Sequence, residues 1–299
     1  MDIKQLHYFC TIAKEGQITR AAKKLHMAQP PLSQQLKQLE VELGVKLMER
    51  QGRNMELTSA GEILYKKATR LLAELEDTKS EVKETGDGLR GILSIGSVKT
   101  CFSYLPEKIR YFRETYPNVT FHLREGDTYF VSELLRNRVI EVAVIRLPLD
   151  TDDFSMIQLP SEPYVAVIPQ KWEHQFRNTT SIEMKELQNL PLLLLHRING
   201  TGQYEMILDE CKRHGFKPHV VCECPDAAML LSLVDAGVGA TLVPKSTLLS
   251  LHTTNTVTLE LQNSKIQSES AVIWLKDRYL SKSAQHFIDT FREHSTIKE

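Results

Sequence analysis

The sequence lacks any long apolar segment. None of its apolar runs approaches the roughly 20 residues that a membrane-spanning helix needs. Its start, MDIKQLHYFC, lacks the charged residues followed by a long apolar stretch that mark a signal peptide. We therefore expect a cytoplasmic protein with no membrane partner. With 299 residues and 41% hydrophobic content, the chain can bury more than one core, so we expect two or three domains.

Cysteine is scarce, and its spacing does not suggest metal binding. The five cysteines are an odd number without a CxxC pair, so neither a disulfide scaffold nor a zinc site is indicated. The ten histidines form no HExxH motif, and we expect no metal site. Cys222 and Cys224 would face the same side of a strand, which leaves a redox switch open as an alternative to buried thiols.

Motifs of catalysis and cofactor binding are also missing. The sequence has no GxSxG, no P-loop and no GxGxxG after a strand, so we expect neither an enzyme nor a bound cofactor. The net charge of −1 argues by itself against nucleic-acid binding. However, residues 1–58 carry nine Lys/Arg against six Asp/Glu, a net charge of +3, and the remainder carries −4. A small basic module on an acidic body is typical of a DNA-binding head joined to a domain with another task.

Three short amphipathic helices are predicted in the basic head. Apolar residues at intervals of three and four predict one helix from Leu6 to Ala13, which Gly16 ends, and a second from Ile18 to Leu25. A third begins at Pro30-Pro31, because the first turn of a helix tolerates proline. Away from its apolar face it carries Ser33, Gln34, Gln35, Lys37 and Gln38. Such hydrogen-bonding side chains suit base edges in the major groove and predict a helix-turn-helix; an ordinary solvated helix is the alternative.

A short β-hairpin is predicted after the third helix. Val45–Leu47 and Met55–Leu57 would form its strands, with Gly52 in the turn. Arg50 and Arg53 lie beside this turn, where they can enter a minor groove or contact phosphates. The hairpin then acts as a wing; the alternative is a pair of solvated surface arginines.

These residues together resemble the winged helix-turn-helix of LysR-type transcriptional regulators. The matching positions, in order, are Ala21-Ala22, Leu25, Gln29-Pro30, Leu32-Ser33, Leu39-Glu40, Leu43-Gly44, Leu47, Arg50, Leu57-Thr58 and Ala60-Gly61. The resemblance implies a ligand-responsive bacterial regulator that binds palindromic, double-stranded promoter DNA. The candidate DNA-binding residues are Thr19, Arg20, Gln29, Pro30, Pro31, Ser33, Gln34, Lys37, Arg50 and Arg53. The family commonly has Arg where this chain has Gln34 or Gln35, and Phe where it has Met48. The first departure affects the details of base readout but not the fold.

A long helix is predicted between about residues 59 and 88. Ser59 to Glu62 offers a capping-box start, and Gly86 and Gly88 mark the end. Its apolar seam follows a heptad pattern through Leu64, Ala68, Leu71, Leu75, Thr78 and Val82. We expect this linker helix to pair with a second copy, giving a homodimer, and packing on its own domain is the alternative. The resemblance extends the expectation to homotetramers, with RNA polymerase as a further candidate partner.

The remainder, residues 89–299, is predicted to be a two-lobed α/β domain. Short β-rich runs alternate with helices, first from about 89 to 160 and again from about 161 to 268, and a late strand at Glu269–Leu275 returns to the first lobe with residues 269–299. The fold class is therefore α plus α/β: a head at 1–58, a linker at 59–88 and this domain. The family resemblance implies a periplasmic-binding-protein-like effector fold.

A ligand site is expected in the cleft between the two lobes. Strand ends and helix N-termini line such clefts, and their free N–H groups attract anions. The candidate effector-binding residues are Ser97, Lys99, Thr100, Gly126, Thr128, Arg146, His196, Thr201 and Gly202, with Asn199 and Gly200 beside them. They suit a small anionic effector, such as a carboxylate, although each residue can also be read as a helix cap or a turn residue. A solute-binding module without a DNA function is the other alternative, but it leaves the basic head unexplained.

Overall fold

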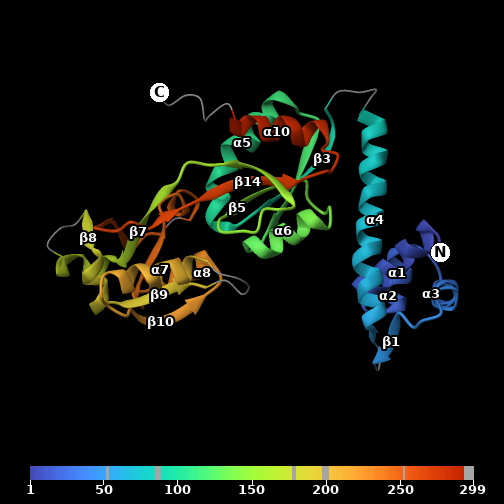
Figure 1. The fold of residues 1–299 in the computed structure, drawn as a ribbon, viewed down its shortest axis with the longest axis horizontal. Coiled ribbons are helices and arrows are strands. Elements are labelled where there is room, and N and C mark those ends of the chain that lie inside the picture. The colour runs from blue at the N-terminus through green and yellow to red at the C-terminus, as the bar shows by residue number, and fades with distance from the viewer. Residues whose placement is uncertain (52–53, 85–88, 177–179, 197–201, 252, 293–299) are drawn as a thin grey trace. The chain divides into compact units, whose positions relative to one another are not determined.

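The chain folds into two compact units, which we describe separately (Figure 1). The structure is a computed structural model that describes residues 1–51, 54–84, 89–176, 180–196, 202–251 and 253–292. One unit holds helices α1 to α4 together with Arg136–Val139, and the other holds the rest of the chain from β3 onward. In the described part of the chain, every helix is too short or too polar to cross a membrane.

The first unit is a three-helix head with a β-hairpin. Asp2 caps α1 by accepting a hydrogen bond from the Gln5 N–H, and Gly16 ends this helix in the left-handed conformation at φ 63°. The core includes Phe9, Ile12 and Leu32, which are almost completely buried, so the predicted apolar faces are confirmed. The elements are α1 (Ile3–Glu15), α2 (Ile18–Lys24), α3 (Gln29–Leu43), β1 (Met48–Gln51) and β2 (Asn54–Leu57).

The hairpin differs from its prediction in the position of its first strand. This strand was expected at Val45–Leu47, but β1 begins at Met48 and continues through Arg50, which pairs with Met55 of β2. Leu47 and Met48 are buried in the head core, which anchors the start of the hairpin. Arg50 therefore lies in a strand and not in the turn; the predicted turn at Gly52 and Arg53 lies outside the described residues.

The long helix α4 (Ser59–Glu84) is capped differently from the prediction. The expected capping box starting at Ser59 is wrong, because the Thr58 hydroxyl accepts the hydrogen bond from the Gly61 N–H at 3.0 Å. Gly61 also lies against the loop between α3 and β1. A Cβ atom at position 61 would be 2.0 Å from the Leu47 carbonyl oxygen. These two contacts explain why threonine and glycine occupy positions 58 and 61.

The second unit contains two sheets, each with its own helices. The first lobe has a five-stranded sheet in the order β4-β3-β5-β14-β6, in which β3, β4 and β5 are parallel and β14 is antiparallel to both neighbours. The late strand thus returns to the first lobe, as predicted, and it lies antiparallel beside the parallel strands β3, β4 and β5. The elements of lobe I are β3 (Gly91–Ser97), η1 (Lys99–Tyr104), α5 (Pro106–Thr115), β4 (Val119–Glu125), α6 (Thr128–Arg136), β5 (Val142–Arg146), β6 (Phe154–Gln158), β14 (Ser270–Leu275) and α10 (Lys282–Arg292).

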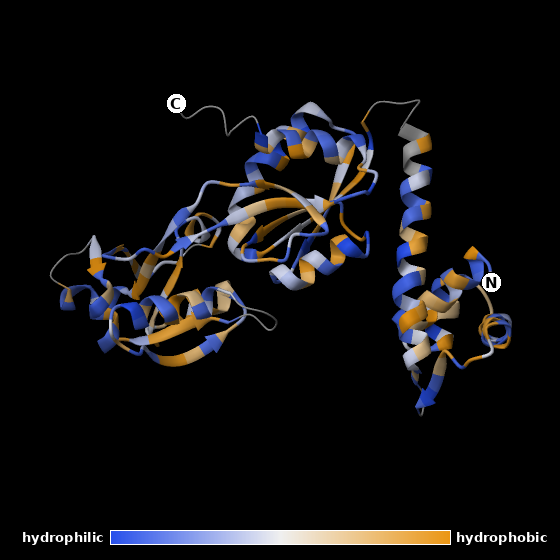
Figure 2. Ribbon diagram, in the orientation of Figure 1, coloured by the Kyte–Doolittle hydropathy of each residue, from blue (hydrophilic) through white to orange (hydrophobic). Residues whose placement is uncertain are grey.

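Lobe II is built on a sheet in the order β10-β9-β11-β7-β12-β8, with β13 paired to β7. Hydrophobic residues predominate in the central strands of both lobes (Figure 2). The chain crosses between lobes twice, before β7 and after β13. The elements are β7 (Glu162–Pro169), η2 (Gln170–Gln175), β8 (Ser181–Glu183), η3 (Met184–Asn189), β9 (Pro191–Leu195), α7 (Gln203–Arg213), β10 (His219–Cys224), α8 (Ala227–Asp235), β11 (Ala240–Pro244), α9 (Thr247–Ser250), β12 (Thr256–Gln262) and β13 (Gln267–Ser268). The sequence-based limits of domains and lobes stay predictions.

Glu40 gives the head a pH-dependent contact that can be tested. Its side chain is 7% exposed and accepts hydrogen bonds from the Leu47 N–H at 2.9 Å, the Met48 N–H at 3.3 Å and the Lys46 ammonium at 2.9 Å. Burial acts to raise the pKa of Glu40, but these hydrogen bonds outweigh it and hold the pKa below its ordinary value of 4.5. The ionised carboxylate therefore stabilises the folded head above that value, and the contribution is lost as the pH falls through the lowered pKa.

We expect Glu40→Gln to lower the free energy of local unfolding by about 1–2 kcal/mol at pH 7, because a charge-assisted set of hydrogen bonds is lost. Hydrogen exchange of the Leu47 and Met48 amides measures this directly. The difference in hydrogen exchange between the variant and the wild type should become smaller as the pH falls below 4.5, because the wild-type carboxylate is then protonated. Glu76→Gln, at a side chain that is 70% exposed, is the control and should exchange like the wild type. Equal exchange in the Glu40 variant at pH 7 would contradict the assignment.

Candidate functional site

The head presents a polar surface along α2, α3 and β1. Of the predicted DNA-binding residues, Ser33 is half-buried and Arg53 lies outside the described residues. The others, Thr19, Arg20, Gln29, Pro30, Pro31, Gln34, Lys37 and Arg50, are exposed. Because Pro30 and Pro31 open α3, its first turn lacks two N–H groups that would otherwise need partners. The helix therefore offers side-chain donors and acceptors on a face that the core does not use.

Two hydrogen bonds fix the hairpin against the turn between α1 and α2. The Met55 N–H donates to the Gly16 carbonyl at 2.7 Å, and the Gln17 side-chain amide donates to Asn54 Oδ1 at 3.0 Å. The strand that carries Arg50 is therefore held in a defined place beside the helices. A helix with an exposed polar face and a fixed hairpin with an exposed arginine match the geometry of a winged helix-turn-helix.

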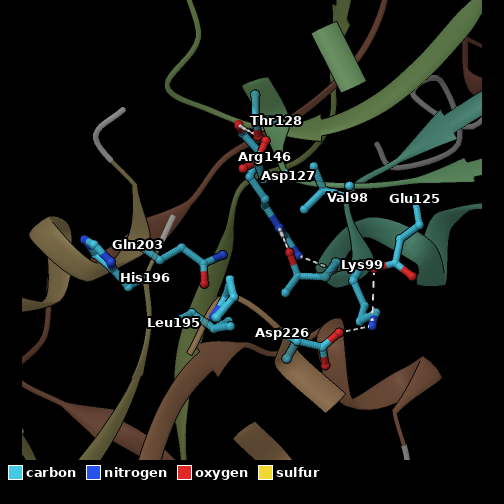
Figure 3. Close-up of a pocket in the computed structure, with 14 residues that line it drawn as sticks. Val98, Lys99, Glu125, Asp127, Thr128, Arg146, Leu195, His196, Gln203 and Asp226 are labelled. Atoms are coloured by element: carbon cyan, nitrogen blue, oxygen red, sulfur yellow. Dashed lines mark hydrogen bonds and ion pairs between the residues drawn. The ribbon is translucent and has the colours of Figure 1, made fainter. Parts of the chain in front are cut away.

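A cavity of about 260 Å³ lies between the lobes of the second unit (Figure 3). Six of the predicted ligand-binding residues line it: Lys99, Thr100, Gly126, Thr128, Arg146 and His196. Ser97 lines a neighbouring cavity instead. Gly202 precedes the lining residue Gln203, while Asn199, Gly200 and Thr201 lie outside the described residues. Strand ends and helix starts from both lobes therefore meet around one space, as the sequence predicted.

Sequence reasoning missed eight residues of the lining. They are Val98, Glu125, Asp127, Leu195, Gln203, Pro225, Asp226 and Ala227. Asp226 carried the same signal as the predicted residues, because it follows a strand and precedes the helix α8. Val98, Leu195, Pro225 and Ala227 give the cavity an apolar wall beside its charged groups.

Arg146 is buried, and its guanidinium is occupied by protein contacts. Only 1% of the residue is exposed. The guanidinium donates to Glu162 Oε1 at 2.7 Å, to the Thr100 carbonyl at 2.7 Å and to Ser246 Oγ at 2.9 Å. Burial lowers the pKa of Arg146, but Cys101 and Glu162 reverse this, so the pKa stays raised and the side chain charged. Arg146 therefore links lobe I to Glu162, at the start of β7, and to Ser246, which precedes α9. Its N–H groups are used in these contacts and not offered to a ligand.

Thr128 supports the same junction. It is 1% exposed, and its hydroxyl donates to the Arg146 carbonyl at 2.9 Å. The proton of this hydroxyl is therefore already committed within the protein. A ligand can therefore bind this hydroxyl only by donating a hydrogen bond to its oxygen.

Lys99 forms the ion pair that crosses the cavity. Its ammonium contacts Asp226 at the start of α8 in lobe II, and it also lies 3.2 Å from Glu125 in lobe I. Burial lowers the pKa of Lys99, but pairing with these carboxylates outweighs it and raises the pKa. Burial likewise raises the pKa of Asp226, and the Lys99 contact reverses this and lowers it. Both groups therefore stay charged, and they link the two lobes.

The charges around the cavity are nearly balanced. Its lining includes two cationic side chains, Lys99 and Arg146, and three carboxylates, those of Glu125, Asp127 and Asp226. An anion that binds the Lys99 ammonium therefore competes with its carboxylate partners Glu125 and Asp226. Farther along, His196 packs edge-on against Tyr204 with ring centroids 4.8 Å apart.

The thiols and acidic groups suggest neither metal binding nor disulfide chemistry. All five cysteines are free, and Cys224 is buried with its sulfur accepting the Asp226 N–H at 3.4 Å. Nothing in the packing of the described residues around Cys222 and Cys224 points to a redox role. The described residues also contain no group of three side chains that could hold a metal ion.

Two family profiles match this chain. Residues 3–62 match the profile described as "Bacterial regulatory helix-turn-helix protein, lysR family", and residues 86–296 match "LysR substrate binding domain". Among curated relatives, the HTH-type transcriptional regulator BsdA of Bacillus subtilis (strain 168) is 42% identical over 293 residues, which cover 97% of this chain and 100% of the relative. The HTH-type transcriptional regulator AlsR of the same organism is 31% identical and covers 96% and 94%.

Solved structures share the fold along the whole chain. Full-length CbnR complexed with its target DNA matches with a TM-score of 0.79 and 24% identity, covering 98% of this chain and 99% of CbnR. A C206 mutant of OxyR from Corynebacterium glutamicum matches with a TM-score of 0.58 and 29% identity, covering 98% and 91%. The similar curated proteins are named as regulators, so an enzyme is not indicated. The chain belongs to the LysR family of bacterial transcriptional regulators, with a DNA-binding helix-turn-helix and a C-terminal effector-binding domain.

Proposed function

We propose that this protein binds palindromic promoter DNA as a homo-oligomer and that a small anionic effector, held in the cavity between the lobes, modulates transcription. The observation that carries the proposal is the Lys99–Asp226 ion pair, which spans that cavity. An anion that binds Lys99 must compete with a group that links the lobes. Binding and lobe arrangement are then coupled through one contact.

The DNA contacts follow from the exposed surface of the head. Gln29, Ser33 and Gln34 lie in the first turns of α3 and read base edges in the major groove. Arg20 and Lys37 contact phosphates, with Thr19 and the Pro30-Pro31 turn close to the backbone. Arg50 and Arg53 of the wing reach the minor groove or its phosphates.

Oligomerisation is supported by the apolar seam of α4. Ala68 is 1% exposed because it packs on the head, whereas Leu71 and Val82 farther along are 55% and 68% exposed in the single chain. A second α4 would bury this part of the seam and place two recognition helices about a twofold axis, as a palindrome requires. We also propose that dimers assemble into tetramers and that the protein contacts RNA polymerase. It acts in the cytoplasm.

The effector acts by changing the partner of Lys99. Lys99 contacts both Glu125 of its own lobe and Asp226 of the other lobe. An effector carboxylate takes the place of Asp226, so the lobes lose one link while Lys99 keeps a counter-charge. The resulting shift between lobes alters the placement of the heads within the oligomer.

Removing the wing charge tests the DNA contacts. We expect Arg50→Ala to weaken binding to the DNA upstream of the protein's own gene and to reduce the slope of log affinity against log salt by about one, because one phosphate contact is lost. Ser33→Ala should instead reduce the preference for that DNA over unrelated DNA, with little change in the salt slope. Arg110→Ala, a surface arginine on α5, is the control. DNase footprinting across a salt series measures both the salt slope and the preference for this DNA. If Arg50→Ala and Ser33→Ala both bind like the wild type, these residues do not contact the DNA.

Removing the cross-lobe charge tests the coupling. We expect Asp226→Asn to change the transcription of a reporter behind this promoter about 5-fold or more without added effector, because the lobes lose their ion pair. Asparagine can still cap α8 by accepting the Met229 N–H, which Asp226 accepts at 2.8 Å. The matched control is Glu125→Gln, which removes the other partner of Lys99 but keeps the cross-lobe pair. If both variants give wild-type output, the ion pair does not couple the site to transcription.

A further inference from the structure

The buried carboxamide of Gln203 is a polar group that the protein itself leaves unsatisfied. Gln203 is the first residue of α7, is 8% exposed and lines the cavity. Its Oε1 is shielded from solvent and has no hydrogen-bond partner in the described part of the chain. Figure 3 shows the side chain extending from its backbone into the cavity. Buried polar atoms in folded proteins almost always have partners, so this exception calls for an external one.

We propose that Gln203 selects the effector by accepting a hydrogen bond from it, so that the effector carries a hydroxyl or amino group in addition to its anionic group. This inference rests on the proposed function, because it places the effector in the same cavity. It narrows the effector from any small anion to a small hydroxy- or amino-carboxylate. Lys99 binds the carboxylate, and Gln203 binds the donor.

Three donor groups near the carboxamide of Gln203 contact other groups instead. The Thr128 hydroxyl donates to the Arg146 carbonyl, and the Tyr204 hydroxyl donates to Glu223 at 2.7 Å. The Lys99 ammonium is paired with Glu125 and Asp226. No described side chain donates a hydrogen bond to Gln203 Oε1, so a ligand in the cavity can supply this donor.

A simple carboxylate does not satisfy the carboxamide. Its oxygens can accept from Gln203 Nε2, but they leave Oε1 buried without a donor. A hydroxyl next to the carboxylate removes this conflict, because it both donates and accepts. The apolar wall formed by Val98 and Leu195 is then free to contact the carbon skeleton of the ligand.

Matched ligand pairs test the inference on the purified full-length protein. Propionate and lactate form one pair, and phenylacetate and mandelate form another; the members of a pair differ by one hydroxyl. Titration calorimetry measures the affinity of each. We expect the wild type to bind the hydroxylated member about 10-fold or more tightly, since a site built around a hydrogen bond discriminates against an analogue that lacks it. Gln203→Leu should abolish this preference, and Gln203→Glu, which retains an acceptor, should keep it.

Tyr204→Phe is the control, because it changes the adjacent residue of α7 without touching the carboxamide. It should retain the wild-type preference. Equal affinity for both members in the wild type, or a preference that survives in Gln203→Leu, overturns the inference. If both members bind equally and both affinities are lost in Lys99→Met, the anionic-effector proposal stands and only the role of Gln203 fails.

The ligand-free protein provides a second measurement. If Gln203 is unsatisfied until a ligand binds, Gln203→Leu should melt at the same temperature as the wild type or higher, because it removes a buried polar group that has no partner. If the carboxamide instead has a structural role, the variant should melt at a lower temperature. That result would overturn the inference whatever the ligand experiments give.

Discussion

Arg146 is a buried cation on which the junction between the two lobes depends. Its guanidinium is removed from water and is compensated by Glu162, the Thr100 carbonyl and the Ser246 hydroxyl. Removing one partner of such a buried pair costs about 3–5 kcal/mol, because the other charge is left without compensation. The same contacts fix η1 next to the end of β5. Lys99 begins η1, so its position in the cavity follows from the Arg146 network.

The two cations of the cavity therefore have different tasks. Arg146 is almost fully buried, whereas the side chains of Lys99 and Asp226 are 26% and 27% exposed. A partly solvated ion pair can exchange one carboxylate for another at a small cost, whereas a buried network cannot. This difference makes Lys99 the group at which an effector can act.

The sequence was most informative where one local pattern determines a structure. The four-three spacing of Leu32, Leu36 and Leu39 predicted a helix whose apolar side is buried, and the structure has this helix. Strand ends followed by helix starts located six residues around one cavity. The first strand of the wing begins later than predicted, because Val45 is exposed and strand pairing starts at Met48. Its start depends on packing in the head core, which the local sequence pattern does not show.

The sequence was least informative about long-range partners. Arg146 was a candidate effector-binding residue, but its guanidinium donates to Ser246, which is 100 residues away, and no local pattern shows that contact. Asp226 was overlooked although it follows a strand and precedes a helix, as the predicted residues do. Gln203 had no signal in the sequence, because an unsatisfied carboxamide is recognised only when all its neighbours are known.

The central claim is that Lys99 and Asp226 act on transcription through their contact with each other. A double-mutant cycle on the reporter, with Lys99→Met, Asp226→Asn and the combined variant and no added effector, tests it most directly. If the account is correct, each single substitution shifts the output, and the combined variant shifts it no further, because the same ion pair is already broken. Effects that add independently would contradict the account.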